Sequence, residues 1–183
     1  MEITKDVLEK LCKDTGASGC AVIDVADIVF DAGLRQNCEL NYCGEYGRTW
    51  VCPPHCGAIE DCIDNVKKYD KALILQTISP LEDSYDFEGM QEAAEQFHKI
   101  LAYVAGKAKA VMPDVLCLSA GGCHLCAKCA VADELPCRHP QEAYPSLESH
   151  GIFVSDLAGR AGMNYINGKD TVTYFGAIFF NHA

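Results

Sequence analysis

The sequence predicts a single α/β domain spanning residues 1–183, built on one small mixed sheet flanked by helices. Segments with helical periodicity alternate with apolar, β-rich segments, which is the pattern of layered α/β domains. Apolar residues make up 49% of the 183 residues, enough for one substantial core. Twelve cysteines are present, and most of them fall in two irregular loops, a first cysteine loop at 38–57 and a second cysteine loop at 121–140.

The N-terminal elements are predicted from their apolar residues. Residues 4–15 carry one apolar helical face, formed by Val7, Leu8, Leu11 and Cys12. This face predicts a first helix, which Gly16 ends. The apolar run 20–25 predicts a strand, whereas 27–36 fits either a strand or a helix.

The middle of the chain gives the clearest periodic signals. Residues 58–69 carry an apolar stripe and predict a helix. The run 71–79 predicts a buried strand, closed by Pro80. In 86–111 apolar residues recur at spacings of three and four, which predicts a long amphipathic helix with its apolar face on the core. Pro113 is expected to end that helix.

The C-terminal elements are shorter. Residues 115–119 predict a strand that runs directly into the second cysteine loop. Ser146 and Ser155 can each cap a short helix, the first ended by Gly151 and the second covering 156–161. The stretch 171–180 is rich in β-branched and aromatic residues and predicts the last strand.

Charge and apolar runs exclude several classes of partner. The formal net charge is -11, with no basic run, so neither nucleic acid nor an anionic membrane surface is expected as a partner. No apolar run approaches the roughly 20 residues needed to span a bilayer. The N-terminus lacks the pattern of a secretory signal, so a cytoplasmic protein is expected. In a reducing compartment, dense cysteine indicates metal or redox chemistry rather than disulfides.

The second cysteine loop has the more specific spacing. Its ligand candidates are Cys123, Cys126 and Cys129, in a C-x2-C-x2-C run, and Cys137. Such runs supply thiolates to 4Fe–4S clusters in bacterial ferredoxins, with a fourth cysteine elsewhere. Gly121 and Gly122 permit close approach of the backbone, and Arg138 and His139 are candidate hydrogen-bond donors to a cluster sulfur. A zinc site of three cysteines with His124 or His139 is the competing interpretation.

The first cysteine loop has a wider spacing. Its ligand candidates are Cys38, Cys43, Cys52 and Cys56, separated by four, eight and three residues, a pattern that matches no zinc ribbon. Cys52 precedes Pro53-Pro54, and cysteine followed by proline occurs in ferredoxin cluster loops. A second 4Fe–4S cluster is therefore expected here. Cys56 is the preferred fourth ligand, His55 is the alternative, and a site of three cysteines also fits.

The other candidates receive ordinary structural interpretations. Cys12, Cys20, Cys62 and Cys117 lie in apolar strands or helix stripes, where cysteine acts as a small hydrophobe. His98 and His150 are interpreted as helix-surface or capping residues. No catalytic triad order, zinc-protease motif or dinucleotide fingerprint is present.

Several of these motifs together resemble a known family. They are Tyr46-Gly47, Trp50, Cys52-Pro53-Pro54, the C-x2-C-x2-C run, 136–140, 145–148 and Gly151. The chain resembles, over about 38–176, the uncharacterised family of predicted metal-binding proteins called domain of unknown function 2284. The resemblance implies a single metal-binding domain with this set of cysteines, and it supplies no substrate. Members occur mainly in anaerobic bacteria and archaea, which suits oxygen-sensitive clusters.

Three functions follow as hypotheses. The first is an iron–sulfur protein with two 4Fe–4S clusters that transfers electrons to a redox partner protein in an anaerobe, its acidic surface docking on a basic partner. The second is a reductase in which one cluster lacks a fourth cysteine and binds a small substrate at an open iron. The third is a zinc-stabilised interaction module. The sequence decides neither between enzyme and carrier nor the oligomeric state.

Overall fold

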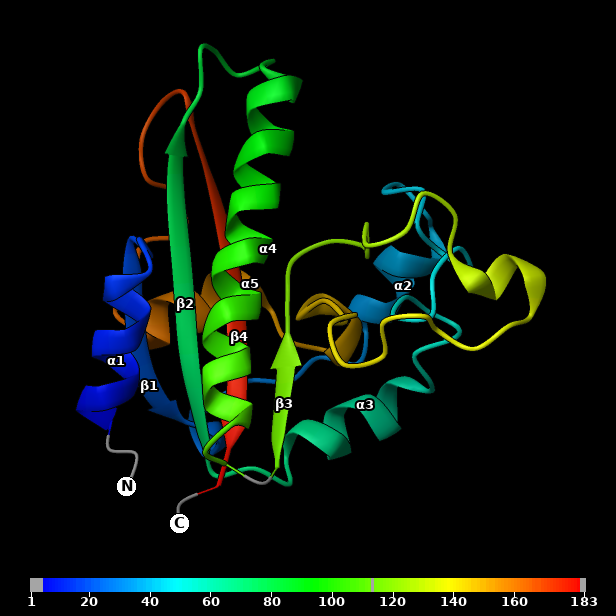
Figure 1. Ribbon diagram of the computed structural model, residues 1–183, viewed down its shortest axis with the longest axis horizontal. Helices are drawn as coiled ribbons and strands as arrows, with labels where there is room; N and C mark the ends of the chain where they lie inside the picture. The colour runs from blue at the N-terminus through cyan, green and yellow to red at the C-terminus, as the bar shows by residue number, and fades with distance from the viewer. Residues whose placement is uncertain (1–4, 113, 182–183) are drawn as a thin grey trace.

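The computed structural model describes residues 5–112 and 114–181, and it confirms the α/β class. Its four strands form one sheet in the order β1-β2-β4-β3, and every neighbouring pair is antiparallel. The strands are β1 (Gly19–Asp24), β2 (Lys71–Pro80), β3 (Val115–Leu118) and β4 (Thr171–Phe180). The two long strands, β2 and β4, lie at the centre of the sheet (Figure 1).

Five α-helices surround this sheet: α1 (Lys5–Asp14), α2 (Leu34–Glu39), α3 (Ile59–Val66), α4 (Phe87–Lys109) and α5 (Val154–Arg160). Three short 3-10 helices accompany them: η1 (Val25–Asp27), η2 (Ala130–Asp133) and η3 (Glu148–His150). The long predicted helix and the last strand are both present. The ambiguous stretch 27–36 contains the start of α2, preceded by a bridge between Phe30 and Ile152. Residue 4 and Pro113, which the sequence assigns to the ends of two helices, lie outside the described residues.

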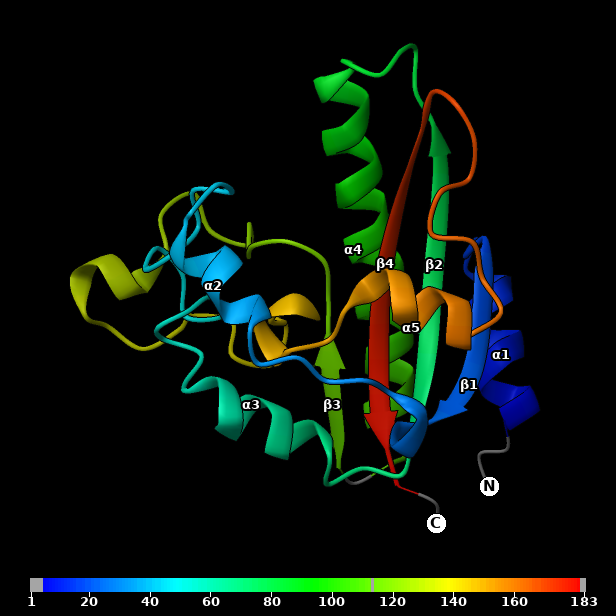
Figure 2. The same cartoon turned by 180° about the vertical axis from the view of Figure 1, so that it is seen from behind.

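The sheet has a hydrophobic core on each face. Helices α1 and α4 cover one face, where Leu73 and Leu75 pack with Phe97 and Leu101. Helix α5 crosses the opposite face (Figure 2), where Ile74 packs against other buried residues. Because side chains alternate along a strand, β2 needs apolar residues at successive positions to fill both cores. This explains its continuous apolar run.

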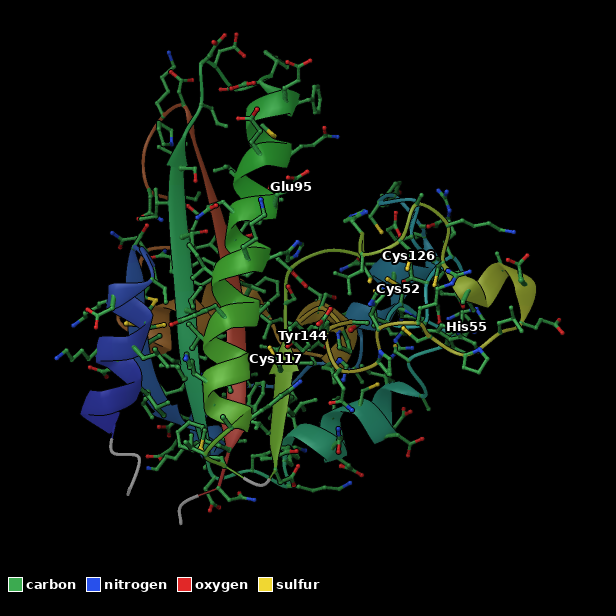
Figure 3. All side chains as sticks on the ribbon, viewed as in Figure 1. Cys52, His55, Glu95, Cys117, Cys126 and Tyr144 are labelled. Atoms are coloured by element: carbon green, nitrogen blue, oxygen red, sulfur yellow. The ribbon has the colours of Figure 1, made fainter. Side chains whose placement is uncertain are left out.

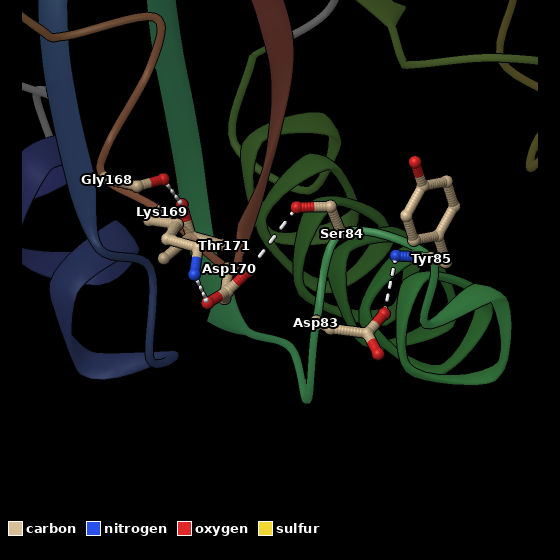
Figure 4. Close-up of polar contacts among 7 residues, drawn as sticks. All are labelled: Asp83, Ser84, Tyr85, Gly168, Lys169, Asp170 and Thr171. Atoms are coloured by element: carbon tan, nitrogen blue, oxygen red, sulfur yellow. Dashed lines mark hydrogen bonds and ion pairs between the residues drawn. The ribbon is translucent and has the colours of Figure 1, made fainter.

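One end of the sheet is closed by hydrogen bonds between loops. The turn before α4 meets the turn before β4 where Ser84 Oγ donates to Asp170 Oδ1 over 3.4 Å (Figure 4). Thr171 Oγ1 also donates to the Gly168 carbonyl over 2.9 Å. No cysteine lies in either turn.

Both cysteine loops project beyond β3, at one edge of the sheet (Figures 1 and 2). The first loop follows from α2 and the second continues from β3. The edge strand β3 pairs only with β4 among the described strands. The sheet therefore holds the two loops side by side, away from the closed end. No helix in the described ranges is long and apolar enough to cross a membrane.

Candidate metal centres

The second cysteine loop gathers its four predicted ligands around one small cavity. Cys123, Cys126, Cys129 and Cys137 all line it, together with Leu125 and Arg138 among others. The chain turns back after η2, and this turn returns Cys137 to the three cysteines of the C-x2-C-x2-C run. The spacing of that run and this turn together bring all four predicted ligand thiols to one cavity.

The electrostatics of this cavity favour a bound cation. Burial raises the pKa of Cys123, and the nearby thiols of Cys137, Cys129 and Cys126 raise it further. The Leu125 backbone N–H acts in the opposite direction by hydrogen bonding to the Cys123 sulfur. The His139 backbone N–H likewise donates to Cys137 Sγ over 3.4 Å. Thiolates that line one cavity repel one another, so a bound metal would stabilise the charged form of these cysteines.

The two basic residues beside Cys137 have other partners. Arg138 Nη1 donates to the Lys128 carbonyl over 3.0 Å, which ties the returning chain to the cysteine run. His139 Nδ1 lies 3.9 Å from Glu142 Oε2. The sequence suggested these side chains as donors to a cluster sulfur. In the structure, the His139 backbone N–H donates to the Cys137 thiol sulfur.

The first cysteine loop brings three of its four candidates together. Cys38 lies on α2, and Cys43 and Cys52 lie in the irregular chain that follows. Burial raises the pKa of Cys52, as do Cys43 and Cys38. The peptide bond between Pro53 and Pro54, directly after Cys52, is cis.

Cys56 makes its main contact with Cys62 of α3. The hydrogen bond between the two thiols raises the pKa of Cys56 and lowers that of Cys62. Arg35 supports the Cys62 thiolate because its Nη2 lies 3.7 Å from Cys62 Sγ. The same guanidinium donates to the carbonyls of Gly57 and Ser149 over 2.9 and 3.1 Å.

Cys62 is therefore more than a small hydrophobe. It is buried, as its apolar stripe predicted, but its thiol faces a cysteine and an arginine. The sequence carried one signal for this contact. Cys62 follows Cys56 by only six residues and lies in the helix that begins directly after the first cysteine loop. Cys12 and Cys117 are buried among apolar residues, in agreement with the sequence interpretation. Cys20 is half-buried and donates to the Glu9 carbonyl over 3.2 Å.

The two loops pack against each other. Trp50 Nε1 of the first loop donates to the Leu135 carbonyl of the second over 2.9 Å. The Trp50 ring also meets His55 edge-on, with ring centroids 5.3 Å apart. A Cβ at Gly122 would lie 2.8 Å from Glu45 Cγ, so the glycine permits a close approach of the loops. Figure 3 shows Cys52, His55 and Cys126 within this one lobe.

No single-ion site is formed within residues 5–112 and 114–181. No group of three or more His, Cys, Asp or Glu side chains among them could hold one metal ion. The four cysteines of the second loop line one cavity.

The two histidines occupy different environments. His98 is half-buried on α4, and its Nε2 lies 3.2 Å from the Ala120 carbonyl, just before the second loop. His150 lies in the last turn of η3 and is buried, with its Nδ1 3.0 Å from Ser149 Oγ. A surface position, one of the two roles predicted for His150, is therefore wrong.

Comparison with known proteins agrees with this description. The model of a family described as predicted metal-binding protein (DUF2284) matches residues 21–180. No curated protein matches the chain, and neither does any solved structure. Because the family model covers most of the chain, including both cysteine loops, this protein belongs to the DUF2284 family of predicted metal-binding proteins.

Proposed function

We propose that this chain is an iron–sulfur protein that binds two 4Fe–4S clusters and transfers electrons to a partner protein. One observation carries the proposal: Cys123, Cys126, Cys129 and Cys137 line one cavity. A 4Fe–4S cluster takes four cysteine thiolates, and C-x2-C-x2-C is a spacing found around such clusters. The residues present therefore fit this group in number and in chemistry.

The surroundings of the second loop also fit a cluster. Backbone N–H groups at Leu125 and His139 point at the sulfurs of Cys123 and Cys137. Hydrogen bonds to the sulfurs are among the features that set a cluster's reduction potential. Zinc is the weaker candidate, because structural zinc sites usually take their ligands as two separated pairs, whereas C-x2-C-x2-C supplies three ligands in one run.

The first loop is proposed to hold the second cluster. Cys38, Cys43 and Cys52 supply three ligands, and Cys56 is the proposed fourth. The Cys52 thiol is near enough to Cys56 to raise the pKa of Cys56. The Trp50–Leu135 hydrogen bond joins the two loops. A bound pair of clusters would therefore lie in one lobe, which supports electron exchange between them.

The protein's own residues have definable roles in this function. When bound, the clusters would accept and release single electrons. The backbone N–H groups at 125 and 139 stabilise thiolate charge, and Trp50 joins the two loops through its hydrogen bond to the Leu135 carbonyl. The net charge of -11 favours a partner with a basic docking surface. Eight ligand thiols stay reduced most readily in the cytoplasm of an anaerobe.

Anaerobic metal and sulfide analysis tests this proposal. We expect about eight iron and eight sulfide per chain, and electron paramagnetic resonance signals from the reduced protein. About four of each would leave one cluster. A colourless protein that contains zinc and no iron would contradict both cluster assignments.

The contact between Cys56 and Cys62 favours one other candidate function. If Cys56 remains paired with Cys62, the first site keeps three thiolates and one iron without a cysteine ligand. An iron of that kind can bind a small substrate, so the protein would be a reductase. Substitution of Cys56 separates the two candidates, as described in the Discussion.

A further inference from the structure

A cavity of about 600 Å³ lies between α4 and the second cysteine loop. This volume is within the range of small-molecule sites. Its wall is mostly apolar, and it is formed by three segments far apart in the sequence. They are α4, the chain from Ser119 to Leu125, and residues 141–144. Figure 3 shows Glu95 and Tyr144 on the side of α4 that faces the loops.

Small residues on α4 open this cavity. Ala102 and Gly106 lie on its wall, one turn apart. A Cβ at Gly106 would meet no atom within 4 Å, so the space beside the glycine is free. On the opposite side, Leu125 and the ring of Tyr144 supply apolar surface. A ligand with an apolar ring therefore fits this wall best.

Several donors surround this apolar wall. Burial raises the pKa of Tyr144 to about 12, so its hydroxyl stays protonated near neutral pH. That hydroxyl has no hydrogen-bond partner among the described residues, and the Lys99 ammonium has none there either. His98 donates from Nε2 to the Ala120 carbonyl, which fixes its ring at the rim. Glu95 and Glu142 also line the cavity, and Glu142 Oε2 lies 3.9 Å from His139 Nδ1. Oxygen acceptors on a ligand would therefore bind at the Tyr144 hydroxyl and the Lys99 ammonium.

The Lys109 ammonium is already engaged. It lies 4.9 Å from the centre of the Tyr144 ring and donates to the Gln141 carbonyl over 2.7 Å. These contacts hold residues 141–144 against α4. The wall that carries the Tyr144 hydroxyl is thus built before any ligand arrives, as in most small-molecule sites.

We propose that this cavity binds a small aromatic compound that carries acceptor oxygens, of the aromatic carboxylate class. Cys123 lines the same cavity, so the ligand would lie directly beside the second metal centre. A ligand site is a property beyond electron transfer. It rests on the proposed function only in placing the ligand beside a cluster. Binding depends on the cavity alone, so the metal analysis and the binding test can fail independently.

Isothermal titration of the anaerobically purified, metal-loaded protein with 2-naphthoate tests the proposal. We expect saturable binding with a dissociation constant of about 1 mM or tighter, the level that an apolar ligand of this size reaches. The cation 2-naphthylmethylammonium has the same ring and only donors, so it should bind at least about tenfold more weakly. No saturable binding of 2-naphthoate, or equal binding of the two probes, would overturn the proposal.

Two variants locate the site. Gly106→Leu fills the cavity and should weaken 2-naphthoate binding at least about tenfold. Its control is Gly159→Leu on α5, another exposed helical glycine whose added Cβ would meet no atom within 4 Å. Neither substitution removes a contact, so both proteins should fold. Unchanged binding by Gly106→Leu, or equal weakening in the two variants, would contradict this location.

Tyr144→Phe tests the proposed donor. It keeps the ring under Lys109 and removes the hydroxyl, so 2-naphthoate should bind about three- to tenfold more weakly. Tyr103→Phe is the matched control, because Lys107 lies 5.3 Å over the Tyr103 ring and that tyrosine does not line the cavity. If both variants bind like the wild type, the Tyr144 hydroxyl is no donor to the ligand and the chemical class assigned here is wrong.

Discussion

At the scale of single residues, Cys56 separates the two candidate functions. It lies between the Cys52 thiol of the first site and the Cys62 thiol of α3. A ligand cysteine turns toward a metal, whereas a cysteine hydrogen-bonded to Cys62 leaves one iron open. The partner of the Cys56 side chain therefore separates the proposed carrier from the proposed reductase.

The Cys56→Ala variant is therefore the first prediction. We expect it to lose one cluster, that is, about four of about eight iron atoms per chain, because four thiolates hold each cluster. Iron and sulfide analysis under anaerobic conditions measures this directly. Cys117→Ala serves as the control, since that cysteine is buried in β3 and should keep all the iron. If Cys56→Ala retains both clusters, the open-iron reductase replaces the electron carrier.

His150 gives the second prediction at this scale. Burial lowers its pKa from 6.5 to about 4, so the folded protein holds this imidazole neutral. The unfolded chain takes up the proton first as the pH falls below 6.5. The contribution of His150 to the free energy of unfolding is therefore fully present above about pH 7. It falls by roughly 3 kcal/mol as the pH drops toward 4.

The difference between wild type and His150→Gln isolates that effect. Glu148 has a raised pKa because of its burial, so its contribution to stability changes in the opposite direction with pH. Its contribution is shared by both proteins and is removed by subtraction. Urea unfolding at pH 7.5, 6 and 4.5 should show the stability advantage of the wild type shrinking with acidity. A difference that is constant with pH would contradict the assignment.

At the scale of elements, α4 contacts both the sheet and the second cysteine loop. Its apolar face packs on β2 and β4, while another side forms the wall of the cavity beside Cys123. Asp86 caps its N-terminus by accepting from the Gly89 N–H over 2.8 Å, and it also accepts from the Glu82 N–H over 3.1 Å. The carboxylate lies where a side chain at 89 would otherwise stand.

Removing this cap is the third prediction. Asp86→Ala should lower the free energy of unfolding by about 1 kcal/mol, the usual value of an N-cap aspartate. Urea denaturation of the metal-loaded protein provides the measurement. Glu92→Ala, an exposed substitution on the same helix, should change stability by less than about 0.5 kcal/mol. Equal effects of the two substitutions would show that the cap contributes nothing particular.

At the scale of the whole molecule, the sheet carries at its β3 edge the lobe formed by the two cysteine loops. The lobe has little regular structure of its own, and its loops contact each other through Trp50 and Leu135. Bound metal would add the covalent links that such a lobe otherwise lacks. Loss of metal should therefore loosen the lobe before the sheet, because the two sheet cores are formed by other residues.

Trp50→Phe supplies the fourth prediction. It removes the hydrogen bond to the Leu135 carbonyl, which is worth about 0.5–1.5 kcal/mol, and keeps most of the apolar contact. Iron should leave the protein about two- to tenfold faster under a chelator. The measurement is the decay of visible absorbance. Tyr42→Phe is the control, since Tyr42 is 87% exposed in the same loop. Equal rates in wild type and Trp50→Phe would show that the contact between the loops does not protect the metal.

Much of the fold was predictable because its signals are local. The helical period of 86–111 and the β-rich run 171–180 predicted α4 and β4 within a few residues. The spacing of Cys123, Cys126 and Cys129 predicted one shared site for the same reason, since only two residues separate each cysteine from the next. The strand order and the antiparallel pairing depend on contacts between distant segments, so periodicity did not supply them.

The sequence by itself determined the α/β class and the membership in a predicted metal-binding family, and it predicted that Cys123, Cys126, Cys129 and Cys137 share one site. Only the tertiary structure decided that the two loops touch, that Cys56 meets Cys62 and Arg35, and that a cavity opens beside Cys123. The physical reason is the range of the interactions. Ligand spacing and apolar periodicity act over a few residues, whereas the Trp50–Leu135 contact joins positions 85 residues apart and forms only when the sheet brings both loops to one edge.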